Sequence, residues 1–255
     1  DRSGRARLAG SRFHDRLRTY SYLYPLETDA AGNSLPDEPD VYHDGDAAAE
    51  SALRFLEMGF TAIKVDPTGP YSFQGGRELS LAELHRAEYT TRRIREAVGD
   101  QADILFGTHG QMTTASAIRL AQRLEPYDPL WFEEPCPPDQ VDAIGAVAAA
   151  TTIPVSAGER VTTRKEFHDL LKAGVRILQP NVGRSGGLWE TKKIAALLHV
   201  GQSPSRAYDR RIQDLITHVA GARDHSFGVF VKIDTGDLLF PDHYVERVQS
   251  HEPTI

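Results

Sequence analysis

The sequence predicts an α/β fold, a parallel (β/α) barrel of the TIM type. Short apolar segments alternate with amphipathic segments of helical length between residues 17 and 199. Several apolar segments end in polar residues, as Trp131-Phe132 does in Glu133-Glu134. The chain has 255 residues, and one such barrel usually takes about 250. Alternation of this kind predicts a parallel sheet whose crossovers are helices.

The alternation comprises six strand–helix units, beginning with an aromatic and β-branched segment. Gly59, Gly99 and Gly174 each follow a predicted helix, which is typical of the residue just beyond a helix C-terminus. The expected strands are residues 17–23, 61–65, 104–106, 130–132, 154–157 and 176–179. The expected helices are residues 47–58, 81–98, 114–124, 141–150, 164–173 and 188–199. A complete barrel needs eight such units.

Both ends of the chain depart from the pattern. Residues 30–46 are rich in turn-forming and acidic residues and predict a loop. After Val200 we expect a short helix in residues 211–220, a strand in 226–233 and a tail in 251–255. We therefore predict a barrel in residues 1–200 and a divergent region in 201–255. That region either completes the barrel irregularly or replaces its last units.

Composition narrows the class of protein. The net charge is -7 and acids and bases are interspersed, whereas a nucleic-acid-binding surface needs a basic stripe. The single cysteine, Cys136, excludes an intramolecular disulfide framework and fits a reducing compartment. No segment approaches the roughly 20 apolar residues of a membrane span, and no signal peptide opens the chain. We expect a cytoplasmic protein with a small-molecule substrate and no membrane or nucleic-acid partner, and leave a homo-oligomer open.

Two consecutive predicted strands deliver carboxylates. Glu133 and Glu134 follow one strand, and Glu159 comes just after the next. Because the strands of a parallel barrel all open onto one face, these carboxylates should meet there. Oxygen ligands of this type bind a hard divalent cation. The alternative is that they are solvated loop residues.

Five motifs in order carry a resemblance to a known family: TAIKVDP, ILFGTH, LWFEEP, VSAGER and ILQPNVGRSGG. Together they resemble the barrel domain of the mandelate racemase subgroup of the enolase superfamily, and most closely its acid-sugar dehydratases. The resemblance covers about residues 1–200. It implies a Mg²⁺ that binds a substrate carboxylate, a base that removes the proton α to it and, in dehydratases, an acid that expels the β-hydroxyl. A divalent cation neutralises the charge that develops on the enediolate oxygens.

The resemblance implies that Glu133 and Glu159 are metal ligands. The family's third ligand is an Asp ending the third strand, a position that reads Gly107 here. His109, two residues on, is expected to bind either the metal or the substrate, although imidazole suits Mg²⁺ less well than oxygen does. The site is therefore His-assisted, a two-carboxylate site with more water, or impaired. Glu134 is expected to hold surrounding groups rather than the metal.

The residues implied to move protons also depart from the family pattern. Lys64 matches a lysine that contacts the substrate carboxylate, while Asp66 replaces a second lysine that acts as a base. Asp66 is expected to be a weaker base, to bind a sugar hydroxyl, or merely to end the strand in a turn. Asn181 replaces an Asp that pairs with a His on the other face. Arg184 lies in a glycine-rich turn that opens a helix, and it is expected either to bind a distal carboxylate or hydroxyl or to belong to a simple turn between strand and helix.

The His that should pair with position 181 has no match in a recognisable motif. The nearest histidines are His199, His218 and His225, and each is interpreted as a surface residue. The chain also begins almost where the barrel begins, so we expect the family's capping domain to be missing. A site without this cover would be more open to water, which weakens its electrostatic interactions.

Three classes of function compete. The first is a Mg²⁺-dependent lyase that dehydrates a sugar acid to a 2-keto-3-deoxy acid. The second is a racemase or cycloisomerase that uses the same enolate, and the third is a catalytically degenerate barrel with a binding or structural role. Polar residues at the strand ends suit a polyhydroxylated substrate, and we therefore predict the dehydratase. These residues are Asp66, His109, Asn181 and Arg184.

Overall fold

The computed structural model describes residues 18–23, 40–69, 77–181, 183–200, 216–219 and 229–232. Within these ranges six parallel strands form one sheet, in the chain order β2-β3-β4-β5-β6-β7. The strands are β2 (Ser21–Tyr22), β3 (Ala62–Val65), β4 (Asp103–Gly107), β5 (Trp131–Glu133), β6 (Val155–Ala157) and β7 (Ile177–Leu178). Parallel pairing of consecutive strands confirms the predicted α/β fold with six strand–helix units.

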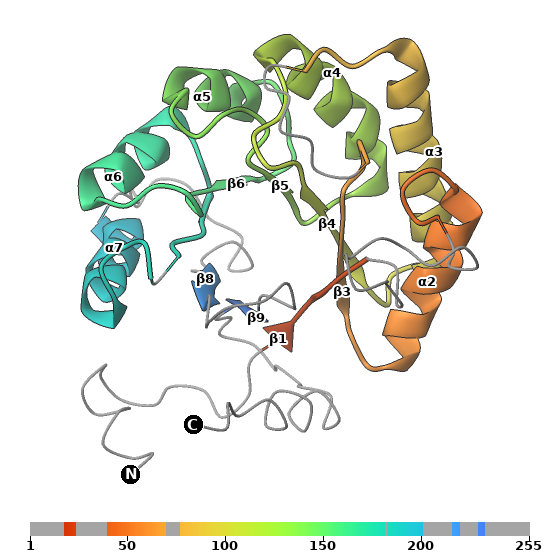
Figure 1. The fold of residues 1–255 in the computed structure, drawn as a ribbon, viewed down its shortest axis with the longest axis horizontal. Helices are drawn as coiled ribbons and strands as arrows, with labels where there is room; N and C mark the ends of the chain where they lie inside the picture. The colour runs from red at the N-terminus through yellow and green to blue at the C-terminus, as the bar shows by residue number, and fades with distance from the viewer. Residues whose placement is uncertain are drawn as a thin grey trace, which may run out of the picture.

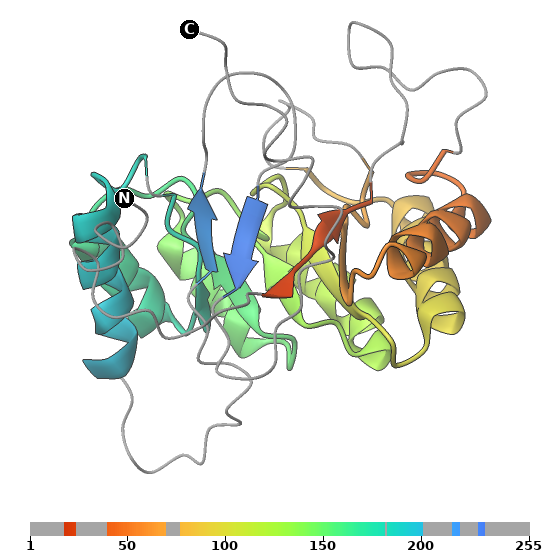
Figure 2. The ribbon, with the colours of Figure 1, turned by 90° about the horizontal axis from the view of Figure 1, so that it is seen from below.

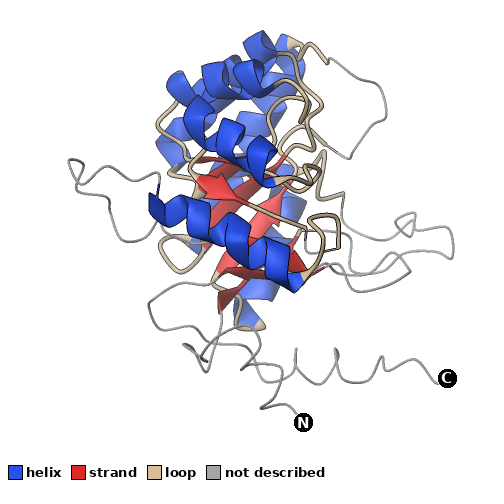
Figure 3. Cartoon of the chain, turned by 90° about the vertical axis from the view of Figure 1, so that its left-hand side faces the viewer, coloured by secondary structure: helices blue, strands red, loops and turns tan. Residues whose placement is uncertain are grey.

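Each of these strands is followed by a helix, and the helices form an arc along the outer face of the sheet (Figures 1 and 3). They are α2 (Gly45–Glu57), α3 (Leu81–Val98), α4 (Thr114–Leu124), α5 (Val141–Ala149), α6 (Arg164–Ala173) and α7 (Leu188–Val200). A short 3₁₀ helix, η1 (Glu125–Tyr127), follows α4. The described part of the chain contains no helix that is long and apolar enough to cross a membrane.

Side-chain caps fix where the helices begin. Ser80 and Thr163 form capping boxes with the glutamates three residues later, which satisfies backbone donors that the first turn leaves without partners. Helices α3, α4 and α6 have the predicted bounds. Helix α2 begins at Gly45, within the segment expected to be a loop, because Asp44 accepts hydrogen bonds from the next backbone N–H groups, those of Asp46 and Ala47.

A second, antiparallel sheet has the order β1-β9-β8 and contains β1 (Arg18–Thr19), β8 (Ile216–Val219) and β9 (Val229–Lys232). It lies between the two end strands of the parallel sheet, β2 and β7 (Figures 1 and 2). The expected helix in residues 211–220 is wrong at positions 216–219, where β-branched residues favour the strand that pairs with β9. The strand predicted in residues 226–233 is confirmed at residues 229–232, the part of it that the structure describes.

The parallel sheet has an apolar core on each face. The larger core fills the space between sheet and helices and includes Phe106, Phe132 and Phe167. The smaller core lies on the opposite face, inside the curve of the sheet, and Tyr20 contacts Trp131 edge-on at 5.4 Å between ring centroids. Its fully buried members are Tyr20, Ala62, Leu105, Trp131 and Ile177. Because side chains alternate along a strand, residues two positions further on the same strands also face inward.

Several expectations lie outside the described residues. The structure does not describe residues 30–39 of the predicted loop in residues 30–46 or the predicted tail in residues 251–255. In the described ranges, the parallel sheet ends at β2 and β7 and is not closed into a barrel by direct pairing of these strands. The boundary at residue 200 between a barrel and a divergent region stays a prediction.

Candidate active site

Polar residues replace the inner apolar core at the carboxyl ends of the strands. Lys64 lies two residues beyond Ala62 on β3, and Glu133 lies two beyond Trp131 on β5. Gln179 follows β7, two residues beyond Ile177. On each of these strands the inward-facing side chains therefore change from apolar to polar or charged within two residues. This end of the sheet is the face where catalytic groups gather in α/β barrels.

A buried ion pair is at the centre of this end. The Lys64 Nζ atom lies 2.5 Å from Glu133 Oε1, and both residues are at most 3% exposed. Glu133 Oε2 accepts hydrogen bonds from Trp131 Nε1 at 3.1 Å and from Gln179 Nε2 at 2.7 Å. A carboxylate offers about four lone-pair sites, so three donors hold Glu133 in place and leave one site on Oε1 for a further partner.

Two long side chains occupy the space beside Gly107, the position expected for a third metal ligand. A Cβ atom at Gly107 would lie 2.5 Å from Lys64 Cε and 2.7 Å from the Tyr22 hydroxyl. The Lys64 ammonium also lies 5.2 Å from the centroid of the Tyr22 ring, within the range of a cation–π interaction. Lys64 and Tyr22 thus fill the space that a side chain at position 107 would need.

Asp66 is buried, with 4% of its surface exposed. Burial raises its pKa to about 7, against the opposing effect of Tyr22 and Lys64. Its backbone carbonyl accepts from Gly69 N at 3.2 Å, so the residue does end the strand in a turn. The carboxyl group nevertheless points away from solvent, and the expectation of a merely structural turn residue is incomplete.

His109 lies next to Asp66, with 3.5 Å between Nδ1 and Asp66 Oδ1. Its ring also stacks against that of Tyr22, with 6.5 Å between the centroids. Burial lowers the pKa of His109, and the nearby Lys64 charge lowers it further. Both effects favour the neutral form of the imidazole, which is the form that can accept a proton or bind a metal.

Two further carboxylates belong to the same end of the sheet. Glu134 is buried and its Oε2 atom accepts from Arg160 Nε at 2.9 Å. Burial raises the pKa of Glu134, and the Arg160 charge opposes the rise. Glu159 is half-buried, and its charge acts on the pKa values of both His109 and Glu134. We call these residues the mouth cluster: Lys64, Asp66, His109, Glu133, Glu134, Glu159 and Arg160.

Asn181 and Arg184 form a turn of their own after β7. The Asn181 Oδ1 atom accepts from Arg184 N at 3.2 Å, and Ser185 Oγ donates to Asn181 O at 2.7 Å. The Arg184 side chain is exposed. Asn181 is buried, and its amide oxygen shapes the turn at the same end of the sheet. His199 and His218 fall in α7 and β8, and His225 lies outside the described residues.

The charges of the mouth cluster suit a divalent cation. Four carboxylates, on Asp66, Glu133, Glu134 and Glu159, face two cationic groups, on Lys64 and Arg160. When all are ionised the carboxylates are in excess by two negative charges. Among the described residues no three His, Cys, Asp or Glu side chains converge into a metal cage. The cluster therefore suits a divalent cation by its negative charge and by the carboxylate oxygens of Glu133 and Glu159. The described residues do not form a closed coordination shell.

Sequence reasoning missed several residues that hold this site together. Trp131 and Gln179 orient Glu133, Tyr22 packs on Lys64, and Arg160 pairs with Glu134. For two of them a signal was available: Trp131 precedes Glu133 by two residues on β5, and Gln179 comes two residues after Ile177 of β7, so each pair is expected on the inward face. Arg160 had no comparable signal, because its partner comes from a different strand–helix unit.

Residues 47–204 match the sequence model of the family described as enolase C-terminal domain-like. D-xylonate dehydratase of Haloferax volcanii is 35% identical over 195 residues, which are 74% of this chain and 44% of that protein. D-galactonate dehydratase of Xanthomonas euvesicatoria pv. vesicatoria is 28% identical over 258 residues, covering 96% of this chain and 60% of the relative.

Solved structures show the same similarity. A protein of Burkholderia SAR-1 assigned to the mandelate racemase/muconate lactonizing enzymes superposes with a TM-score of 0.68 at 57% sequence identity. The match covers 76% of this chain and 46% of that one. The chain thus spans about half the length of the relatives it matches.

Proposed function

The chain belongs to the enolase C-terminal domain-like family, and on that premise we propose that it provides the barrel of a Mg²⁺-dependent dehydratase of sugar acids. The curated relatives named above are dehydratases of D-xylonate and D-galactonate. The observation that carries the proposal is the excess of carboxylates over cationic groups in the mouth cluster. This arrangement suits a site that receives a cation together with an anionic substrate.

Glu133 and Glu159 would hold the Mg²⁺, because Glu133 keeps one lone-pair site on Oε1 and Glu159 lies within electrostatic range of His109 and Glu134. When bound, the cation lowers the energy of the enediolate that forms as the α-proton leaves. His109 is the remaining candidate ligand. Its neutral imidazole fits either this role or a contact with the substrate.

Lys64 would hold the substrate carboxylate, because its ammonium is buried and already faces a carboxylate, that of Glu133. Asp66 is the candidate base for the α-proton. Its pKa of about 7 lies close to the working pH, where a general base is most effective. His109, Asn181 and Arg184 would contact the hydroxyl groups and any distal carboxylate of the substrate. The product would be a 2-keto-3-deoxy acid.

A screen of aldonic and aldaric acids with Mg²⁺ in D₂O tests this proposal. Formation of a 2-keto acid supports the dehydratase. Deuterium uptake without keto acid would instead indicate a racemase or cycloisomerase, and the absence of both signals from folded protein would indicate a degenerate barrel. Glu133→Gln and Glu159→Gln should each abolish turnover, whereas Glu88→Gln on the outer surface of α3 serves as the matched control. A cytoplasmic location and the oligomeric state stay predictions.

A further inference from the structure

Two residues of the mouth cluster have an unusual backbone conformation. His109 has a φ of 54° and Glu134 a φ of 40°. Within the described ranges only one other residue besides glycine, Asp128, has a positive φ. Side chains with a Cβ atom rarely adopt this region, and such residues persist only where their surroundings hold them. Two of the three cases therefore fall at the candidate active site.

A single guanidinium group contacts both strained residues. Arg160 Nη2 donates to the backbone carbonyl of His109 at 2.9 Å. The Nε atom of Arg160 donates to Glu134 Oε2 at 2.9 Å, and Nη2 lies 2.7 Å from the same oxygen. Arg160 follows β6, while His109 follows β4 and Glu134 follows β5. The side chain thus joins the loops of three consecutive strands.

The surroundings of the guanidinium are tightly packed. A Cβ atom at Gly110 would lie 2.3 Å from Arg160 Nη2, so only glycine leaves room for the arginine there. Gly110 N donates to the Glu134 carbonyl at 2.6 Å. The Thr108 hydroxyl donates to the carbonyls of Glu133 and Glu134 at 2.8 and 3.0 Å. These bonds tie the loop that carries His109 to the strand end that carries Glu133.

We propose that Arg160 is a positioning residue, which holds His109 and Glu134 in their left-handed conformations and thereby sets where the His109 imidazole and the Glu133 carboxylate point. The part of this inference that concerns turnover rests on the proposed dehydratase function, whereas the part that concerns the loop does not. Arginine suits the role because its planar group donates in several fixed directions at once, and a lysine ammonium cannot reproduce that geometry.

The loop itself gives the first test. In Arg160→Lys, hydrogen exchange at the Gly110 amide should accelerate by about tenfold or more, because a local opening that costs about 1.4 kcal/mol less is ten times more populated. The imidazole resonances of His109 should shift in the same variant. Arg123→Lys is the matched control, since Arg123 pairs with Glu88 at 2.8 Å on the outer helices. The control should change neither signal.

Turnover gives the second test. If His109 is displaced by a fraction of an ångström, kcat should fall by about 10- to 100-fold, which is a larger factor than the accompanying rise in KM. A general loss of structure would instead lower the amount of active protein and leave kcat per active site unchanged. Glu134→Gln keeps the shape of the pair with Arg160 but removes the negative charge. It should therefore lower kcat more than it changes the KM, as Arg160→Lys does, but by a smaller factor. This second variant keeps the test open if Arg160→Lys does not fold.

The two proposals fail in different ways. If wild-type protein turns over no sugar acid, the dehydratase function is wrong, and hydrogen exchange and the His109 resonances still decide the role of Arg160. If wild-type protein is active but Arg160→Lys and Glu134→Gln leave the Gly110 exchange rate, the His109 resonances and kcat unchanged, the positioning role is wrong.

Discussion

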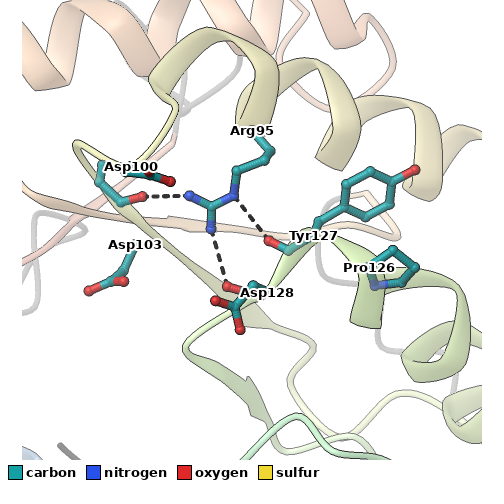
Figure 4. Close-up of a pocket in the computed structure, with 7 residues that line it drawn as sticks. Arg95, Asp100, Asp103, Pro126, Tyr127 and Asp128 are labelled. Carbon is teal, nitrogen blue, oxygen red and sulfur yellow. Dashed lines mark hydrogen bonds between the residues drawn. The ribbon is translucent and has the colours of Figure 1, made fainter.

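At the carboxyl end of the sheet, Lys64 and Arg160 each pair with a buried glutamate. At the amino end, Arg95 lines a cavity of about 280 Å³ (Figure 4) and donates to four backbone carbonyls. These carbonyls belong to Gly99, Ala102, Tyr127 and Asp128, at distances between 2.8 and 3.2 Å. The acidic side chains of Asp100 and Asp128 beside this arginine are exposed to solvent.

The two ends of the sheet differ in whether their charged groups are hydrated. At the amino end the guanidinium joins α3 to the loops before β4 and β5, and charged groups keep their hydration. At the carboxyl end carboxylates lose their hydration, which raises the pKa values of Asp66 and Glu134. Buried charges of this kind cost stability unless they are paired. Their presence at one end only therefore indicates a site that serves binding or chemistry.

The largest stability effect should come from the buried ion pair. Lys64→Met leaves the Glu133 carboxylate buried without its cation, and we expect a loss of about 3–5 kcal/mol in the free energy of unfolding. Urea denaturation measures it. The double variant Lys64→Met/Glu133→Leu should recover much of the loss, because neither charge remains. If the single variant were as stable as wild type, the carboxyl end would not carry the electrostatic cost inferred for it.

The pH dependence of Asp66 should be the next largest effect. Its pKa is raised from an ordinary 3.8 to about 7 in the folded chain, so the folded protein holds a proton that the unfolded chain releases. Stability should therefore fall as the pH rises from about 4 to about 7, by on the order of 4 kcal/mol, because each pKa unit corresponds to about 1.4 kcal/mol. Asp66→Asn should remove this slope. Denaturation midpoints of both proteins, measured at several pH values, would contradict the argument if their slopes were equal.

Arg95→Met should have a smaller effect and only on stability. It removes the donor of four backbone carbonyls, but water can reach this cavity and replace part of the bonding, so we expect a loss of about 1–2 kcal/mol. Mg²⁺ affinity and turnover should stay as in the wild type. A change in the Mg²⁺ affinity measured by calorimetry, or in the turnover rate, would show that the two ends of the sheet are coupled. The separation of the two ends inferred above would then be wrong.

The smallest effect should come from Glu83, on the outer rim of the carboxyl end. Hydrogen bonds from Arg77 and Ser80 lower its pKa from 4.5 to about 2, the opposite of the shift at Asp66. Its contribution to stability is present above about pH 4.5 and is lost as the pH falls towards 2. Glu83→Gln should cost about 1 kcal/mol at neutral pH and less in acid. Thermal denaturation at pH 3 and pH 7 distinguishes this from a pH-independent packing loss.

Local patterns in the sequence were sufficient for most of the fold. Helical periodicity and capping residues predicted the bounds of α3, α4 and α6, because both act over one or two turns of chain. The same kind of signal failed at residues 216–219, where pairing with β9 decides that the segment is a strand. Parallel order followed from the alternation of strands and helices. Parallel order predicted that Glu133, Glu134 and Glu159 lie at one end of the sheet, and the resemblance added Lys64.

What only the tertiary structure decided is which groups touch. Lys64 and Glu133 are 69 positions apart in sequence, and Arg160 is 51 from His109, so no periodicity links them. The sequence showed Gly107 as a missing ligand, whereas packing shows that Lys64 and Tyr22 occupy its side-chain space. It showed Asp66 as a turn residue or weak base, and burial decides its pKa. Propensity and pattern act along the chain, but desolvation and charge pairing depend on distances that exist only after folding.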